Sequence, residues 1–373
     1  MLRRWSKRAA PSAAPLAVEA VFIPEARRGA GRGTLCVSSQ AGCSLACGFC
    51  RTGQQALAGS LPAGAIVEQV LLARARLRAR AGGGASAGGA SGEPHSPPPQ
   101  QKLLQVASPI SHVVFMGQGE PLLNWRSVRT AIRALVSPLG LALPPRRITV
   151  STAGVAPLIP SVAAETPGVR LAVSLHAPRD ALRSELMGIN AQWPIAAVLA
   201  ASQSFIDLRL AALRGRDANI DDDDDMEEEE EDDRDDEGAG KGPSADRGAV
   251  ALPRSDRHNG ARRVRVTFEY VLLDGVNDDA ACARELADLL RGGIRDAPWH
   301  AHVNLMHFNA FPGAAFSRSS DERAAAFQRA LARRGLRATV RRSRGLDILG
   351  ACGMLRSSDR EKGATAAAAA AAE

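Results

Sequence analysis

Three cysteines within eight residues carry the most specific chemistry in this chain. Cys43, Cys47 and Cys50 form a C-x3-C-x2-C pattern, which supplies one thiolate fewer than a four-ligand metal site needs. A cubane iron–sulfur cluster has four irons, so three thiolates leave one iron open to a small molecule. The spacing therefore predicts a [4Fe-4S] cluster whose fourth iron is chelated by a bound ligand.

Two other uses of these cysteines fit the sequence less well. A structural zinc site wants four ligands, but no second C-x2-C pair exists, and the next histidine, His95, lies in a Gly/Pro-rich stretch. A disulfide framework is the other alternative. Six cysteines in 373 residues, without an apolar signal segment, indicate a reducing compartment instead.

Further motifs follow in order along the chain. They are TLCVSSQAG at 34–42, FMGQGEPL at 115–122, ITVSTAG at 148–154, SLHA at 174–177, NAFPG at 309–313 and ACG at 351–353. Together with the cysteines, they resemble the RlmN/Cfr family of radical S-adenosylmethionine (SAM) RNA adenine methyltransferases. The resemblance runs from about residue 18 to residue 355, with two interruptions.

The resemblance implies that SAM binds the open iron through its amino and carboxylate groups. An electron from the cluster would then break the sulfonium and give a 5′-deoxyadenosyl radical. Gly119 and Glu120 follow a predicted strand, where glycine lets the backbone approach a ligand and a carboxylate can pair with the SAM ammonium group. The other SAM contacts that the resemblance implies are Ser151, Ser174, Leu175, His176 and Asn309.

Two cysteines outside the cluster motif are the expected catalytic residues. In the family that the chain resembles, Cys352 is methylated by a first SAM, and a radical from a second SAM takes hydrogen from that methyl group. The resulting carbon radical adds to an adenine carbon, and Cys36 resolves the adduct by forming a disulfide with Cys352. Glu19 matches the proton acceptor, with Glu25 as the competing candidate. Cys282, among alanines and leucines, is interpreted as a buried apolar cysteine.

The expected function is therefore methylation of adenosine C2 in ribosomal RNA, with transfer RNA as a further candidate substrate. Three alternatives stay open: methylation at adenine C8, a radical-SAM activase acting on a partner protein, and a degenerate RNA-binding homologue without turnover. The resemblance also implies a flavodoxin or ferredoxin electron donor, a monomer, no membrane association and a cytoplasmic location, with a plastid or mitochondrion as the alternative.

Alternating strand and helix patterns must position these residues. The predicted strands are 34–38, 112–116, 147–152, 169–175, 263–272 and 302–306, and the predicted helices are 63–80, 124–136, 194–214, 279–290 and 321–334. Such alternation predicts a parallel sheet with the motifs at its carboxyl end. The expected fold class is α/β, a partial (β/α)6 TIM-like barrel of the radical SAM type.

The predicted organisation is one core with two disordered insertions. Residues 1–18 are expected to be an N-terminal extension in place of the family's helical accessory domain, residues 19–356 the methyltransferase core, and residues 357–373 a low-complexity tail. The insertions are expected at 82–101, which is Gly/Ser/Ala- and Pro-rich, and at 215–260, which is acidic and nearly free of apolar residues.

Charge is distributed very unevenly. Fifteen of the seventeen residues from 221 to 237 are acidic, whereas the whole chain carries a net charge of +7. Without this run, which also holds one arginine, the 47 basic and 40 acidic side chains become 46 and 25, a net charge of +21. Such a balance favours binding of a polyanion such as RNA.

Overall fold

Short apolar, β-branched segments form one curved sheet that carries the rest of the fold. The structure, a computed structural model, describes residues 2–7, 16–24, 33–82, 109–217, 264–341 and 353–355. The sheet has nine strands in the order β1-β2-β3-β6-β7-β8-β9-β10-β11. Their bounds are β1 (Leu2–Lys7), β2 (Leu16–Pro24), β3 (Gly33–Cys36), β6 (Ile110–Phe115), β7 (Ile148–Thr152), β8 (Arg170–Ser174), β9 (Val266–Leu272), β10 (Ala301–His307) and β11 (Arg337–Arg341).

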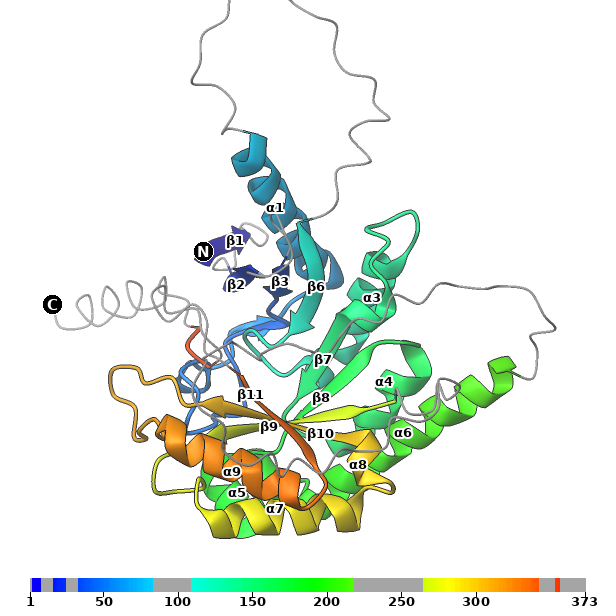
Figure 1. Ribbon diagram of the computed structural model, residues 1–373. Helices are drawn as coiled ribbons and strands as arrows, with labels where there is room; N and C mark the ends of the chain where they lie inside the picture. Colours follow the sequence, from blue (N-terminus) through cyan, green and yellow to red (C-terminus); the bar gives the residue numbers. More distant parts are fainter. Residues whose placement is uncertain are drawn as a thin grey trace, which may run out of the picture.

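Strand β3 and strands β6 to β11 are all parallel, and β1 and β2 extend the β3 edge in antiparallel pairing. The sheet curls into a partial barrel with most helices on its outer side (Figure 1). A second, two-stranded ladder pairs β4 (Gln40–Ala41) with β5 (Gly59–Ser60) beside the cysteine loop. The predicted fold class, an α/β partial barrel, is confirmed.

Amphipathic helices pack their apolar faces against the sheet. In α3, the buried residues Val128, Ala131, Ile132 and Leu135 recur at helical spacing. The longer helices are α1 (Ala63–Gly82), α3 (Trp125–Val136), α6 (Ile195–Asp217), α7 (Ala280–Gly293) and α9 (Asp321–Arg333), and the shorter ones are α4 (Ile159–Glu165), α5 (Asp180–Leu186) and α8 (Ala297–His300).

The six predicted strands and five predicted helices all exist, each with both ends within three residues of the expected position. Strands β1, β2 and β11 and the short helices have no counterpart among the predicted elements. Residues 2–7, expected to be part of a separate extension, pair along β2 and so belong to the sheet. The bulk of the two insertions, at 83–101 and 218–260, and the tail lie outside the described residues.

Helix α6 is long and unusually apolar. Of the residues that the structure describes, its segment Ile195–Gly215 has the length and hydropathy of a membrane-spanning helix, although only a third of it is buried. The same features suit a core helix, and Val198, Phe205 and Ile206 of α6 belong to the hydrophobic core. The helix also packs along α4 and α7.

Candidate active site

A cavity opens where the cysteine loop meets the carboxyl ends of the parallel strands. Loop residues form one wall, and side chains from β7 to β10 and the turns after β6 and β8 form the others. Of the predicted cluster and SAM-binding residues, the cavity is lined by Cys43, Cys47, Cys50, Gly119, Glu120, Ser151, Ser174, His176 and Asn309. The structure therefore brings together all of these predicted residues except Leu175.

The three cluster cysteines lie in a tight loop between β4 and the 3-10 helix η1 (Thr52–Gln54). The amide of Cys50 donates to the carbonyl of Cys47 at 3.0 Å, and a Cβ on Gly53 would lie 2.9 Å from the backbone of Cys47. This close approach explains the glycine at that position. All three sulfur-bearing side chains face the same cavity.

Burial makes these thiols poor acids when no cation is present. It raises the pKa of Cys43 to about 11 and raises the pKa of Cys47 and Cys50 as well. Three neighbouring thiolates therefore need a positively charged centre, and iron would supply it. Within the described part of the chain, no three His, Cys, Asp or Glu side chains are grouped closely enough for a single metal ion. A cubane cluster differs because each thiolate binds its own iron.

The carboxylate of Glu120, in the turn after β6, is held by two backbone amides. Its Oε1 accepts from Leu122 N at 2.9 Å and its Oε2 from Ala153 N at 2.7 Å, so the carboxylate caps the 3-10 helix η3 (Pro121–Asn124) and reaches the end of β7. Burial raises the pKa of Glu120 to about 7, although these amides oppose the shift. Gly119 has a φ of +91°, and a Cβ there would lie 2.4 Å from Gln40, so only glycine fits.

His176 is fixed in one tautomer beside the cavity. Its Nδ1 accepts from Val271 N at 3.0 Å, so the ring proton must lie on Nε2. The rings of His176 and Phe49 pack edge to face, with their centroids 4.7 Å apart. Burial lowers the pKa of His176 to about 3, with Arg183 adding to the effect, so the ring is neutral. Its φ of +59° is rare for a residue with a side chain.

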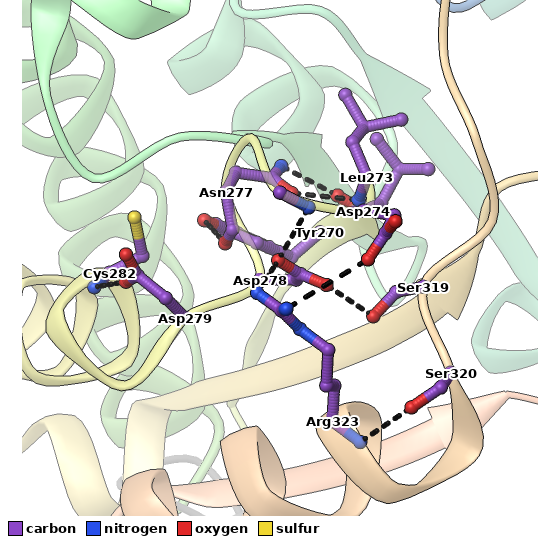
Figure 2. Close-up of polar contacts among 12 residues, drawn as sticks. Tyr270, Leu273, Asp274, Asn277, Asp278, Asp279, Cys282, Ser319, Ser320 and Arg323 are labelled. Atoms are coloured by element: carbon purple, nitrogen blue, oxygen red, sulfur yellow. Dashed lines mark hydrogen bonds and ion pairs between the residues drawn. The ribbon is translucent and has the colours of Figure 1, made fainter.

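Asn277, which the sequence analysis missed, holds the backbone around His176. Its Nδ2 donates to the carbonyls of His176 at 2.9 Å and Val271 at 2.7 Å, and its Oδ1 accepts from Leu273 N at 2.8 Å. The hydroxyl of Tyr270 donates to the Asn277 carbonyl at 2.8 Å. Figure 2 shows the contacts of Asn277 with Tyr270 and Leu273 in the turn that follows β9. The contacts of Asn277 stabilise the left-handed backbone of His176.

Asp278 anchors the same turn from the other side. Its Oδ2 accepts from Ser319 Oγ at 2.5 Å, and its Oδ1 accepts from Arg323 at 2.6 Å and from Gly275 N at 3.1 Å (Figure 2). Asp278 does not line the cavity. The turn is therefore braced by Asn277, which holds the backbone of His176, and by Asp278, which bonds to Ser319 and to Arg323 of α9.

Arg183 is a second buried support that the sequence did not reveal. Its Nη2 donates to Ala153 O at 2.7 Å and to Ser174 O at 3.1 Å, and its Nε donates to Leu175 O at 3.1 Å. This guanidinium ties the ends of β7 and β8 together below the cavity. Leu175, a predicted SAM contact, is fully buried in the core and outside the cavity lining, and its amide donates to Glu269 O.

Cys36 lies beside the segment that precedes the C-terminal tail. It is buried in a small cluster with Val21 and Leu355. The carbonyls of Gly353 and Leu355 accept from Arg51 N at 2.8 Å and Thr52 Oγ1 at 2.6 Å, so this segment is bound to the cysteine loop. Cys352 lies outside the described residues, directly before Gly353, which lines the cavity.

Glu19 lies on the same face of the sheet as Cys36. Val21 pairs with Cys36, and Glu19, two residues away on β2, shares the face of Val21. Ser38 Oγ donates to the Glu19 carbonyl at 2.7 Å and holds this part of β2 against the chain after β3. Glu25, the competing candidate, lies outside the described residues.

Comparison with known proteins identifies the family of this chain. The chain is 39% identical to the "Dual-specificity RNA methyltransferase RlmN" of Xanthobacter autotrophicus, covering 93% of this chain and 66% of that protein. It is 36% identical to the protein of the same name from Chelativorans sp., covering 96% and 71%. The chain belongs to the RlmN family.

A further RlmN relative and a solved structure agree with this assignment. The RlmN of Cereibacter sphaeroides is 37% identical, with 91% of this chain and 66% of that protein covered. A crystal structure of a radical SAM methyltransferase from Sphaerobacter thermophilus superposes with a TM-score of 0.67 at 34% identity, covering 95% of this chain and 77% of that one. No model of a known protein family matches the chain. The chain spans about two thirds of the length of the RlmN relatives.

Proposed function

We propose that this chain is a radical-SAM RNA methyltransferase that methylates C2 of adenosine in ribosomal RNA, with transfer RNA as a second substrate. The observation that supports the proposal is that residues 353–355, directly after Cys352, contact both the cluster-cysteine loop and Cys36. The cysteine loop hydrogen-bonds to residues 353–355, and Cys36 packs against Leu355. This arrangement brings the segment after Cys352 next to both Cys36 and the cluster cysteines.

The residues present suit a [4Fe-4S] cluster and SAM. Cys43, Cys47 and Cys50 would hold the cluster, which when bound supplies the electron that cleaves SAM into a radical. Glu120 can accept from the amino group of SAM once it is ionised, and neutral His176 can donate through Nε2. Ser151, Ser174 and Asn309 add hydroxyl and amide groups on the same cavity wall.

Two sulfurs and one carboxylate would then divide the transfer of the methyl group. Cys352 carries the methyl, and its carbon bonds to the adenine ring. Glu19 would take the ring proton once the adduct radical has given one electron back to the cluster. The Cys36 thiolate would then attack the Cys352 sulfur, so that the S–S bond forms as the S–C bond breaks, and the released carbon would take up a proton to become the methyl group of the RNA. Cys36 and Glu19 share a face of the β2–β3 pair, in keeping with their joint action on one adduct.

A pair of substitutions tests these roles. Cys36→Ala should still form the covalent protein–RNA adduct but fail to release it, whereas Cys352→Ala should form neither adduct nor product. A denaturing gel with labelled RNA measures both. Cys282→Ala is the matched control, because Cys282 is buried outside the cavity lining and should leave product formation unchanged. Methylated RNA from the Cys352→Ala protein would overturn the proposal.

Product analysis separates this function from its alternatives. Mass spectrometry of the RNA distinguishes 2-methyladenosine from 8-methyladenosine. If neither nucleoside were found in ribosomal or transfer RNA, the result would favour a protein activase or a degenerate homologue. We also propose a monomer that takes electrons from flavodoxin or ferredoxin and acts in the cytoplasm, with a plastid or mitochondrion as the alternative. Light scattering, reconstitution with each donor and a fluorescent fusion test these three points.

A further inference from the structure

A buried carboxylate in the cavity has no role in the function derived so far. Glu269 lies in the middle of β9, is 4% exposed and lines the cavity. Its register partner on β8 is Ser174, and its partner on β10 is Asn304, which in turn pairs with Thr339 on β11. Because partners in a parallel sheet share a face, these four residues form a polar row across four strands.

A chain of side-chain hydrogen bonds connects Thr339 through Asn304 to Glu269. Thr339 Oγ1 donates to Asn304 Oδ1 at 3.1 Å, which leaves the Asn304 amide to donate to both oxygens of Glu269, at 3.2 and 3.0 Å. Only the hydrogens of one amide nitrogen supply these two contacts. A carboxylate offers about four lone-pair positions, so Glu269 keeps the capacity to accept from a ligand in the cavity.

Hydrogen bonds from a ligand would stabilise the buried carboxylate of Glu269. Burial raises its pKa, whereas the charge of Arg341 and the Asn304 hydrogen bond favour the ionised form. A buried carboxylate with one amide partner is still poorly compensated for lost hydration. Glu120, the other acid in the cavity, already accepts a backbone amide on each oxygen. Glu269 is therefore the acid better placed to receive new donors.

We propose that Glu269 accepts hydrogen bonds from the ribose hydroxyls of SAM. The inference rests on the proposed function, which places the amino-acid end of SAM at the cysteine loop. That loop follows β3 and β4, whereas β9 lies four strands from β3 in the sheet, about 19 Å along its curve at about 4.8 Å per strand. The loop cysteines and Glu269 line the same cavity, so the nucleoside end can extend from the loop toward β9, where a carboxylate is a good acceptor for ribose hydroxyls.

The test compares ligands with and without one hydroxyl. In the reconstituted full-length protein, equilibrium dialysis would measure dissociation constants for S-adenosylhomocysteine and its 2′-deoxy and 3′-deoxy analogues. The wild type should bind at least one deoxy analogue about 10-fold more weakly than the parent. Glu269→Gln, which keeps the shape and one acceptor, should bind the parent about 10- to 100-fold more weakly and lose most of that discrimination.

Glu165→Gln is the matched control, because it changes another acid to its amide in a partly buried contact between α3 and α4, outside the cavity lining. It should leave ligand affinity and discrimination unchanged. If Glu269→Gln does not fold, Asn304→Ala, at a half-buried position, should show a smaller loss of the same discrimination.

Several outcomes would overturn the inference. One is that removal of a ribose hydroxyl weakens binding equally in wild type and Glu269→Gln. Another is that Glu269→Gln keeps its ligand affinity but loses RNA product, which would assign Glu269 to the substrate adenine. A wild-type protein that binds SAM with this discrimination but never modifies RNA would refute the proposed function and leave the role of Glu269 intact.

Discussion

Two walls of one cavity hold a buried carboxylate each, by different means. Glu120 sits in a turn after β6 and is fixed by backbone amides of that turn and of β7. Glu269 sits within β9 and is fixed by the side chain of Asn304 on the next strand. The first arrangement needs glycine at 119, because the turn allows no side chain there, and so it leaves a recognisable local motif. The second leaves none, because its partner lies 35 residues away in sequence.

The largest expected effect concerns the wall that the cysteine loop forms. Cys47→Ala should reduce bound iron from about four atoms per chain to nearly none after anaerobic reconstitution, and SAM cleavage should vanish with it. Iron analysis and the visible absorption of the cluster measure the change. Cys282→Ala serves as the control and should retain its iron. A wild-type iron content in Cys47→Ala would remove the loop from cluster binding.

The β9 wall should depend on Asn277 for its shape. Asn277→Asp places a carboxylate opposite the carbonyls of His176 and Val271, which now accept from the amide. Loss of these buried hydrogen bonds should cost about 3 kcal/mol of unfolding free energy and weaken SAM binding. Urea unfolding and dialysis measure the two effects. Ser319→Ala, on the far side of the turn, should destabilise the protein while leaving SAM affinity unchanged.

The pH dependence of SAM binding should come largely from Glu120. Its pKa is about 7 in the free protein, so protonation below that value removes the acceptor for the SAM amino group. Affinity should fall by about 10-fold per pH unit as pH drops below 7, approaching a constant value above it. Titrations from pH 6 to 8 measure the slope. Glu120→Gln should bind weakly with a flatter profile, whereas an unchanged profile would exclude Glu120.

The folding stability of the free protein should change with pH in the opposite direction to SAM affinity. Because folding raises the pKa of Glu120, its contribution to stability is fully present below its unfolded pKa, near 4.5, and is lost as pH rises to about 7. SAM binding would favour the ionised form and counteract that loss. Thermal melts with and without SAM across this pH range would reveal the two trends.

The smallest effect is expected at an ion pair away from both walls. Glu165 on α4 accepts from Arg129 and Trp125 of α3 in a partly buried contact. Glu165→Gln should lower the unfolding free energy by about 1 kcal/mol or less and leave SAM affinity unchanged. A change in SAM binding would show that the helical layer, and not the two walls alone, sets the shape of the cavity.

Apolar periodicity was sufficient to predict most of the sheet and its helices. It failed for β11, because Arg337, Thr339 and Arg341 alternate on the inner face of a partial barrel, where no apolar partner is required. It also gave no reason to bury Arg183, whose partners are carbonyl groups at the ends of two strands. Local motifs predicted the cluster cysteines and Glu120. Contacts between distant segments, such as those of Glu269 and Asn277, have no local pattern.

The contact between Thr52 and Leu355 has a consequence for how the protein is made. The two residues are 303 positions apart, yet one hydrogen bond joins them beside the cluster cysteines. A ribosome delivers the cysteine loop early and residues 353–355 only after most of the chain has been synthesised. The cysteine loop therefore lacks its contacts with residues 353–355 during nearly all of translation. We expect iron loading to be completed after translation, and a ribosome-bound nascent chain halted before residue 353 to retain the cluster poorly.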